Sequence, residues 1–326
     1  MDAILVTGGA GYIGSVVAEL LVARGYPTVV LDNLSEGHRE AVPPGAEFVA
    51  GDLNDRAMLD GVFAGRRVSA VVHMAAVALV EESVRLPLRY YRQNVAATLN
   101  LLEAMLEAGV RRMVFSSSCA TYGVPAVVPI TEAAPTEPVN PYGHTKLICE
   151  RMFQEAHRAA SLDFVSLRYF NAAGASETLG EDHHPETHLI PRVLAVAAGR
   201  HAALDIYGAD YPTPDGTCVR DYIHVLDIAQ AHLIALERTE PGSAAIYNLG
   251  TGRGDSVRQV VASAERVTGR RIPCRLLDRR PGDPPELVAD SSRIRRELGW
   301  EPKRGLEEIL RSAWQWFEGH PGGYSG

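Results

Sequence analysis

The sequence predicts an α/β fold, in which a doubly wound parallel sheet is joined to a second, smaller α/β domain. From Ala3 to Tyr169, short apolar runs alternate with segments of helical periodicity, the pattern of a parallel sheet covered by crossover helices. After Gly174 the chain turns polar and loop-like before helices and strands resume. We therefore expect one domain over residues 1–172 and another over 173–326, with residues 220–250 packing back on the first.

Composition and charge restrict the class of protein. The chain has 32 Lys and Arg against 40 Asp and Glu, a net charge of −8, so no excess of basic residues favours nucleic acid or an anionic membrane as partner. Its 4 cysteines form no CxxC pair, which favours reduced thiols over a disulfide framework or a structural zinc site. No basic leader precedes a long apolar run, and no run is long enough to span a membrane. We expect a cytoplasmic protein.

The first predicted strand, Ala3–Thr7, runs into the turn GGAGYIGS and then into a helical segment. The turn carries Gly8, Gly11 and Gly14 at the spacing that lets backbone approach a pyrophosphate and lets the helix pack on the strand. Amide groups at the start of that helix can bind the phosphates. The turn predicts a dinucleotide site of the Rossmann type.

The next two strands end in aspartates. Thr28–Leu31 is followed by Asp32, about twenty residues after the glycines, where a carboxylate accepts hydrogen bonds from a ribose and repels a 2′-phosphate. NAD is therefore favoured over NADP, and His38 and Arg39, which follow within a few residues, weaken this preference slightly. Phe48–Val49 is followed by Asp52, for which two interpretations are equally good: a residue near the adenine, or a turn aspartate that caps the helix beginning near Asp55.

A fourth strand, Ala70–His73, continues into small residues that would let backbone lie against a cofactor. We interpret His73 as a structural histidine, because no partner base has a matching spacing. The segment Ser83–Ala108 is helical with a break at Pro87, and Asn94 lies on it. The fifth strand, Arg112–Ser116, ends in three serines.

Tyr142 and Lys146 lie four residues apart at the start of the next helix, which extends to Ala160. They therefore share one helix face, and an ammonium beside a phenol favours the phenolate. Ser118, at the carboxyl end of a parallel strand, can reach a ligand in the same crevice. Taken alone, these residues have plainer interpretations. Tyr142 and Lys146 could simply share an exposed helix face, and Ser118 could simply belong to a serine-rich turn.

The second half contains further predicted elements and two clusters of charged residues. The cluster of His183, His184 and His188 with acidic neighbours follows no familiar ligand spacing, so we interpret it as a solvated loop and expect no metal. Arg279 and Arg280 can clamp a diphosphate or form an exposed basic loop. The remaining predicted elements are the strands Asp163–Tyr169, Ala203–Tyr207 and Ile246–Leu249, and the helices Leu189–Ala198, Val225–Leu236, one ending at Ala264, and Gly305–Phe317.

Ten motifs together resemble the extended short-chain dehydrogenase/reductase family, and within it the branch of UDP-sugar 4-epimerases. They are GGAGYIGS, LDNLSEGH, GDL, HMAA, SSSCATYG, NPYGHTK, LRYFNAAGA, YPTPDGTCVRDYIHV, YNLGTG and RRPGDPP. The glycine turn and NPYGHTK alone resemble any NAD(P) enzyme of the family, whereas DGTCVRDYIHV with RRPGD is typical of the epimerase branch. The resemblance extends over the whole chain.

The resemblance implies an enzyme that inverts carbon 4 of a UDP-hexose, UDP-glucose or UDP-galactose, through a transient 4-keto sugar and tightly bound NAD. It implies that Tyr142 is the base, that Lys146 tunes its pKa and binds the ribose, and that Ser118 bonds the sugar 4-oxygen. The implied cofactor residues are Gly8, Gly11, Tyr12, Ile13, Gly14, Asp32, Asn33, Asp52, Leu53, Met74, Ala75, Ala76, Asn94, Tyr142, Lys146 and Tyr169. The implied substrate residues are Ser118, Tyr142, Asn171, His188, Leu189, Tyr207, Arg220, Tyr222, Arg280, Asp283 and Leu287.

This chain departs from the family pattern at three places. Ala78 stands where many members have a lysine near the nicotinamide. Thr187 and His188 replace paired asparagines, so a phosphate contact there would come from His188. Leu287 stands where members restricted to glucose and galactose often carry tyrosine, which predicts a larger pocket near sugar carbon 2 and partial tolerance of N-acetylated sugars.

Other functions fit parts of the same pattern. The alternatives are a 4-epimerase of UDP-N-acetylglucosamine or UDP-glucuronate and, less well, a non-catalytic NAD-sensing protein, which has no need of the tuned phenol. The expected partners are a UDP-sugar and a second copy of the chain, joined through Ser83–Ala108 and Tyr142–Ala160.

Overall fold

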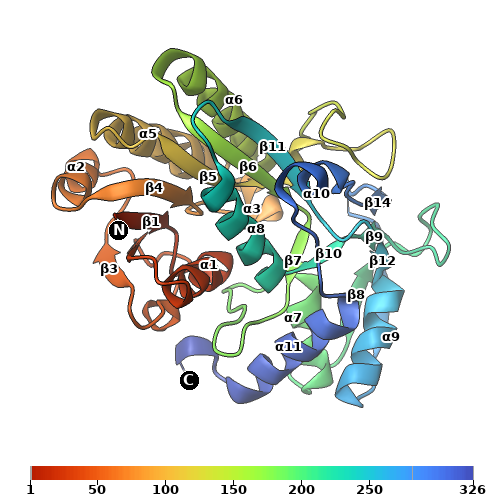
Figure 1. Ribbon diagram of the computed structural model, residues 1–326. Coiled ribbons are helices and arrows are strands. Elements are labelled where there is room, and N and C mark those ends of the chain that lie inside the picture. Colours follow the sequence, from red (N-terminus) through yellow and green to blue (C-terminus); the bar gives the residue numbers. More distant parts are fainter. Residues whose placement is uncertain (1, 281, 326) are drawn as a thin grey trace. The chain divides into compact units, whose positions relative to one another are not determined.

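The first compact unit is built on a seven-stranded parallel sheet with the strand order β11-β6-β5-β4-β1-β2-β3 (Figure 1). In a computed structural model of the chain, residues 2–280 and 282–325 are described. The strands of this sheet are β1 (Ala3–Thr7), β2 (Thr28–Asp32), β3 (Glu47–Ala50), β4 (Val68–His73), β5 (Arg112–Ser118), β6 (Asp163–Tyr169) and β11 (Ala244–Leu249). The predicted doubly wound fold is confirmed.

The order of the strands reverses between β1 and β4, which both pair in parallel with their outer neighbours. Open α/β sheets bind ligands outside the carboxyl ends of strands at such a reversal. Here those ends are Thr7, which leads into the glycine turn, and His73, which leads into Met74. The fold therefore places the predicted cofactor residues where a dinucleotide is expected.

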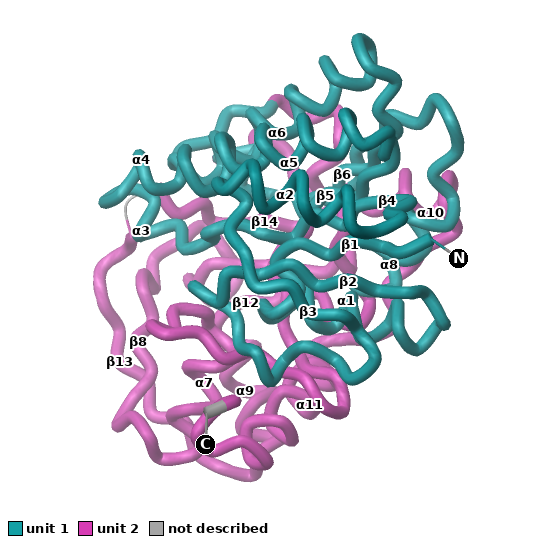
Figure 2. Tube along the Cα trace, turned by 90° about the vertical axis from the view of Figure 1, so that its left-hand side faces the viewer, with its two compact units in different colours: residues 1–123, 136–168, 229–247 teal, residues 124–135, 169–228, 248–326 magenta. Residues whose placement is uncertain are grey.

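Helices cover both faces of the sheet (Figures 1 and 2). On one face, Leu101, Phe115 and Phe153 belong to a buried apolar core between the sheet and α2, α5 and α6. The helices of this unit are α1 (Tyr12–Ala23), α2 (Arg56–Ala64), α3 (Val80–Arg85), α4 (Pro87–Tyr90), a π-helical segment (Tyr91–Ala96), α5 (Ala97–Glu107), α6 (Pro141–Ala160) and most of α8 (Val225–Arg238). Short 3₁₀ turns lie at Arg39–Ala41 and Cys119–Thr121.

The second compact unit packs helices α7 (Leu189–Ala197), α9 (Val257–Thr268) and α11 (Leu306–Gly319) around their own apolar core, and α10 (Ser292–Leu298) is shorter. Its strands form small sheets of two or three strands. They are β7 (Asn171–Ala173) with β10 (Tyr222–His224), β8 (Leu204–Tyr207) with β13 (Cys274–Leu277), and β12 (Asp255–Ser256), β9 (Val219–Arg220) and β14 (Glu286–Leu287). A 3₁₀ turn, Gly323–Ser325, follows α11.

Both units are assembled from separate stretches of chain (Figure 2). The first unit comprises residues 1–123, 136–168 and 229–247, and the second comprises 124–135, 169–228 and 248–326. Among the described residues, no helix combines the length and the apolar character needed to cross a bilayer.

Candidate active site

The glycine turn packs tightly against the segment that follows β4. Gly8 has a φ of +69°, and a Cβ added there would lie 2.5 Å from the amide nitrogen of Ala75. Only glycine tolerates both the positive φ and this approach. At the end of the turn, Gly11 precedes α1 without any capping side chain, so the first amide groups of α1 meet no side-chain acceptor from that position. This backbone suits a pyrophosphate.

Asp32 is fixed beside the glycine turn. Its Oδ2 accepts a hydrogen bond from the amide of Ala10 at 3.0 Å, and its Oδ1 accepts one from Leu34 at 2.8 Å. Burial raises the pKa of Asp32, and these backbone donors act in the opposite direction. Nearby, the Arg39 guanidinium lies 4.5 Å over the ring of Phe48, so Arg39 is engaged in packing within this region. The carboxylate suits the ribose of NAD.

Asp52 joins the ends of β2 and β3. Its Oδ2 accepts a hydrogen bond from Asn33 at 2.8 Å, and its Oδ1 accepts the amide of Asn54 at 2.8 Å. The residue that caps α2 is instead Asp55, which accepts the amide of Met58 at 3.0 Å. Asp52 is thus a turn aspartate paired with Asn33, and its contact with an adenine stays a prediction.

The other predicted cofactor residues of this unit also follow the carboxyl ends of strands. Asn94 is buried in the π-helical segment, and its amide group exchanges hydrogen bonds with the backbone of Val77 at 2.9 and 3.0 Å. It also donates to the Thr145 hydroxyl at 3.0 Å, one residue before Lys146. Asn94 therefore positions the segment after β4 against α6, and its contact with a diphosphate stays a prediction. The rest are Tyr12 and Ile13 in α1, Leu53 after β3, Met74, Ala75 and Ala76 after β4, and Tyr169 at the end of β6.

Tyr142 and Ser118 meet because α6 begins directly against the turn after β5. Asn140 caps α6 by accepting the amide of Gly143 at 2.9 Å, which places Tyr142 in the first helical turn. A Cβ on Gly143 would lie 2.4 Å from the carbonyl oxygen of Ala120, so glycine allows this contact. Ser118 Oγ accepts the Ala120 amide at 3.1 Å and is hydrogen-bonded to the phenol of Tyr142. The structure brings the two predicted catalytic side chains together.

Burial controls the protonation of Tyr142 and Lys146 in this geometry. It raises the pKa of Tyr142 to about 12, although the hydrogen bond with Ser118 lowers it. It lowers the pKa of Lys146 to about 8, against the charges of Cys149 and Glu150. Lys146 Nζ donates to the carbonyl of Ser116 at 2.8 Å and lies 5.8 Å from the centre of the Tyr142 ring. Burial therefore outweighs the lowering of the Tyr142 pKa that we expected from Lys146.

A buried ion pair lies one helical turn beyond Lys146, and sequence reasoning missed it. Glu150 accepts hydrogen bonds from Ser117 Oγ at 2.6 Å and from Arg168 Nε at 2.8 Å. The guanidinium of Arg168 also lies 4.7 Å over the ring of Tyr122. The available signal was Glu150 on the same helix face as Lys146, with an arginine inside the apolar strand DFVSLRY.

The predicted diphosphate residues meet in the second unit. Arg220 on β9 is buried, and its guanidinium contacts the Asp283 carboxylate at 2.5 Å. The guanidinium of Arg280 stacks 3.9 Å over the ring of Tyr207, and its buried Nε has no hydrogen-bond partner among the described residues. Leu287 pairs directly with Arg220 in the small sheet. An unpartnered buried guanidinium nitrogen is expected where an anionic ligand binds.

Two further predicted residues and one unpredicted residue belong to the same unit. Asn171 on β7 lies opposite Tyr222 on β10. Tyr211 was missed: the ring lies 4.3 Å from the Arg279 guanidinium, and burial and the charge of Asp283 raise its pKa. Its hydroxyl is buried without a hydrogen-bond partner in the described part of the chain. The signal in the sequence was a second tyrosine four residues after Tyr207.

The histidine-rich loop is only partly solvated. His188, just before Leu189 at the start of α7, has its Nδ1 2.9 Å from Glu181 and 3.0 Å from Glu186. Burial lowers the pKa of His188, but the two carboxylates outweigh it and raise the pKa to about 10. His184 and His188 are exposed, as the solvated-loop interpretation expects, whereas the side chain of the neighbouring Glu181 is only 8% exposed. A phosphate contact by His188 stays a prediction.

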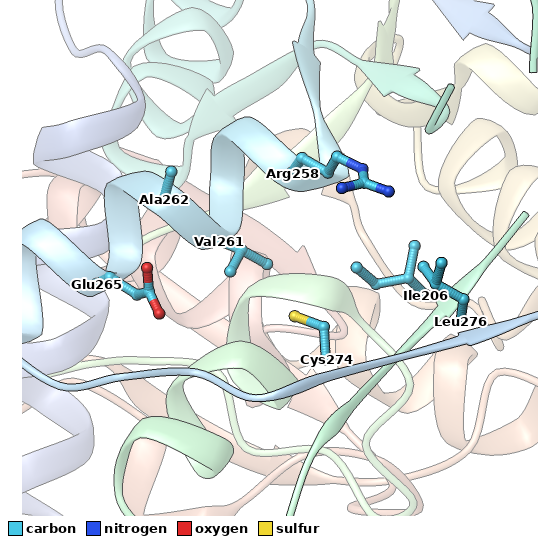
Figure 3. A pocket seen from close by; sticks show the side chains of 7 residues that line it. All are labelled: Ile206, Arg258, Val261, Ala262, Glu265, Cys274 and Leu276. Atoms are coloured by element: carbon cyan, nitrogen blue, oxygen red, sulfur yellow. The ribbon is translucent and has the colours of Figure 1, made fainter. Parts of the chain in front are cut away.

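A pocket of about 420 Å³ opens elsewhere on the second unit, between α9 and the ribbon of β8 and β13 (Figure 3). Apolar side chains form most of its wall, and Arg258 and Glu265 project from α9. The lining residues are Ile206, Arg258, Val261, Ala262, Glu265, Cys274 and Leu276. None of these seven is a site residue predicted from the sequence, so the pocket is not part of the candidate site.

Comparison with known proteins gives consistent matches over the whole chain. Residues 4–250 match the model of the NAD dependent epimerase/dehydratase family. The UDP-glucose 4-epimerase of Streptomyces lividans is 53% identical over 321 residues, 98% of this chain and 97% of that protein. The crystal structure of UDP-glucose 4-epimerase from Brucella ovis in complex with NAD is 49% identical, with a TM-score of 0.94, and covers 97% of this chain and 98% of that chain. The UDP-Glc/GlcNAc 4-epimerase of Campylobacter jejuni is 40% identical, with a TM-score of 0.86, over 98% of this chain and 100% of that chain.

Proposed function

The chain belongs to the NAD dependent epimerase/dehydratase family, and from this premise we propose that it is an NAD-dependent 4-epimerase that interconverts UDP-glucose and UDP-galactose. The observation that carries the proposal is the meeting of Ser118 and Tyr142 with Lys146 one helical turn away, at the edge of the sheet that holds the glycine turn. A protein that only senses NAD has no use for a hydrogen-bonded phenol at this place.

Tyr142 acts as the base of this reaction. It takes the proton of the sugar 4-hydroxyl, and Ser118 holds that oxygen by a hydrogen bond. To take this proton Tyr142 must be in its phenolate form, and the positive end of the α6 dipole favours that anion. The glycine turn and Asp32 would hold NAD, which when bound would supply a reversible hydride acceptor for carbon 4. Tyr142 then returns its proton to the sugar after the 4-keto form has turned its other face, so the reaction has no net redox change.

The second unit supplies the groups that hold the nucleotide. Arg220 and Arg280 bind the diphosphate, and Tyr207 packs beside Arg280. Anchoring through the nucleotide lets the sugar rotate without leaving the enzyme. In this proposal residues 1–172 form the NAD-binding domain, and residues 173–326 bind the UDP-sugar.

Replacing Tyr142 by phenylalanine tests the assigned base. We expect Tyr142→Phe to keep bound NAD, measured from the nucleotide released on denaturation, while epimerisation of UDP-galactose falls by three or more orders of magnitude, roughly the contribution of an acid/base group. Tyr26→Phe is the control, because the Tyr26 hydroxyl donates a hydrogen bond to the exposed Glu237 at 3.3 Å, and Tyr26 is not a predicted site residue. Epimerisation at the wild-type rate in Tyr142→Phe would refute the role.

A specific observation favours a second substrate class, the N-acetylated UDP-sugars. Leu287 is paired with Arg220 and therefore lies beside a residue proposed to bind the diphosphate. The similar protein of Campylobacter jejuni is described as a UDP-Glc/GlcNAc 4-epimerase. We include partial activity on UDP-N-acetylglucosamine in the proposal.

The proposal also includes a homodimer in the cytoplasm. What supports the dimer is a set of exposed apolar side chains between the start of α3 and the start of α5, which we call the helical patch. Its members are Val80, Val84, Leu86, Leu88, Tyr91 and Leu99, exposed by 46%, 63%, 49%, 81%, 37% and 44%. Exposed apolar side chains gathered within one stretch of helices are typical of a protein interface.

A further inference from the structure

Four side chains from one short loop of the second unit converge on a single point. Glu181, His183, Glu186 and His188 each offer one ligand atom, and these atoms all lie within 4.8 Å of one another. His188 Nδ1 is 2.9 Å from Glu181 and 3.0 Å from Glu186. His183 Nδ1 is 3.2 Å from Glu181 and 3.7 Å from Glu186. We call this group the Glu181 cluster.

The spacing within the Glu181 cluster is close to that of a tetrahedral coordination shell. Zinc binds histidine nitrogen and carboxylate oxygen at about 2.1 Å, and four tetrahedral ligands at that distance lie about 3.4 Å from each other. The distances from the two histidine nitrogens to the nearest oxygens of the two carboxylates are 2.9 to 3.7 Å, and the four ligand atoms all lie within 4.8 Å of one another. A metal ion would draw the most distant of these atoms closer together.

The donor set also matches zinc in chemistry and charge. Imidazole and carboxylate together suit Zn²⁺ better than Ca²⁺ or Mg²⁺, which prefer shells of oxygen. The two carboxylates balance the two positive charges of the ion. The site is also sheltered, since the exposed side-chain fractions are 8% for Glu181, 24% for His183, 23% for Glu186 and 43% for His188.

We propose that Glu181, His183, Glu186 and His188 form a structural zinc site that fixes the loop leading into α7. Four protein ligands leave no open position, which is typical of a structural site. Glu186 already accepts the backbone amide of His188 at 2.7 Å, so the ligands are held by the same loop that they would fix. The cluster contains none of the predicted catalytic or cofactor-binding residues and shares only His188 with the predicted substrate residues, so its loss would loosen α7 without removing the catalytic base.

Metal analysis of the holoenzyme tests the proposal. The enzyme is treated with a chelator, incubated with Zn²⁺, desalted, and assayed by mass spectrometry of the metal. We expect close to one zinc per chain, a higher melting temperature than in the chelated enzyme, and a loss of zinc of tenfold or more in Glu181→Gln and His183→Gln. His201→Gln is the matched control, because His201 is an exposed histidine of the same unit outside the cluster, and it should keep the metal.

A second measurement needs no variant and so remains valid if a substitution prevents folding. Co²⁺ added to the chelated wild-type enzyme should give the intense visible absorption of tetrahedral cobalt, which Zn²⁺ then abolishes. The proposal is overturned if the wild-type enzyme retains no zinc and gives no such spectrum, or if a folded His183→Gln that still holds NAD keeps as much zinc as His201→Gln. The cluster would then be a network of hydrogen-bonded imidazolium and carboxylate groups.

Discussion

We expect a single side chain, Leu287, to limit the space for the sugar in the proposed substrate site. It is partly exposed and faces Arg220 across the small sheet. We expect Leu287→Tyr to lower kcat/KM for UDP-N-acetylglucosamine by 10-fold or more, because one misfit group in a pocket is worth about 1–3 kcal/mol. Activity on UDP-galactose should change less than about threefold.

Steady-state assays of the two substrates in the wild type and Leu287→Tyr provide the measurement. The conservative variant Leu287→Met is the control, since it keeps both volume and apolar character. A wild-type enzyme that is active on UDP-glucose but shows no turnover of UDP-N-acetylglucosamine would contradict the role of Leu287.

Lys146 reduces the stability of the fold at neutral pH, because burial lowers its pKa from 10.5 to about 8. Below pH 8 it is charged in both states, and the folded state then carries a cost of about 3 kcal/mol. Between pH 8 and 10.5 the unfolded chain binds more protons than the folded chain, so this cost disappears as pH rises. From pH 7 to pH 10, the unfolding free energy of the wild type should therefore rise by about 2–3 kcal/mol more than that of Lys146→Met does.

Urea unfolding of both proteins at the two pH values measures this difference. Comparing the change with pH removes the constant effect of losing the hydrogen bond from Lys146 to the Ser116 carbonyl. If the unfolding free energies of the two proteins change equally over this range, the pKa of Lys146 is that of a lysine in water and the prediction is wrong. Lys146→Met should in addition lose most epimerase activity, so that function and stability make opposite demands on this residue.

At the level of elements, α6 is joined to β5 and β6 by the buried pair of Glu150 and Arg168. Glu150→Ala leaves the Arg168 guanidinium buried without its partner, which costs about 3–5 kcal/mol. We expect a fall in melting temperature of several degrees by calorimetry. Glu155→Ala on the same helix is the control, because Glu155 and Arg158 form an exposed pair worth less than about 1 kcal/mol. Equal effects of the two substitutions would refute a structural role of the buried pair.

The elements of the first sheet were predictable because each has a local signal. All six strands expected up to Tyr169 are present, since each buried run is bounded by turn residues or by a helix. The break predicted at Pro87 is also present, but the helix beyond it contains a π-helical segment around Asn94. The sequence carries no local signal for that segment, which coincides with the pairing of Asn94 and Val77.

The elements of the second unit were harder to predict because they depend on partners far along the chain. Strands β9, β12 and β14 have two residues each, too few for any periodicity, and the pairing of Leu287 with Arg220 joins residues 67 positions apart. The same reason explains the site residues that were missed. The pair Glu150 and Arg168, and Tyr211 beside Arg279, are defined by packing between segments. The Glu181 cluster lies within one loop but has no familiar ligand spacing.

At the level of the whole molecule, the chain passes several times between its two units. Residues 124–135 belong to the second unit although they lie between segments of the first, and residues 229–247 are the converse case. The domains expected over residues 1–172 and 173–326, with 220–250 packing back on the first, were inferred from composition along the chain, which carries no signal for residues 124–135. The motifs that identify the family could be found without knowing how the chain passes between the units, because each motif is complete within a few residues.

Assembly of two copies is the remaining question at this scale, and the helical patch makes it testable. In a twofold dimer each substitution occurs twice in the interface. Leu88 is 81% exposed, and burying a leucine is worth about 1.5–3 kcal/mol, so Leu88→Asp should cost more than about 3 kcal/mol of dimer stability. Light scattering after size exclusion should then give the mass of two chains for the wild type and of one for Leu88→Asp at micromolar concentration.

Val127→Asp is the control, because Val127 is 73% exposed but lies outside the helical patch. A wild type of monomeric mass, or a Leu88→Asp variant as dimeric as Val127→Asp, would exclude the helical patch as the interface.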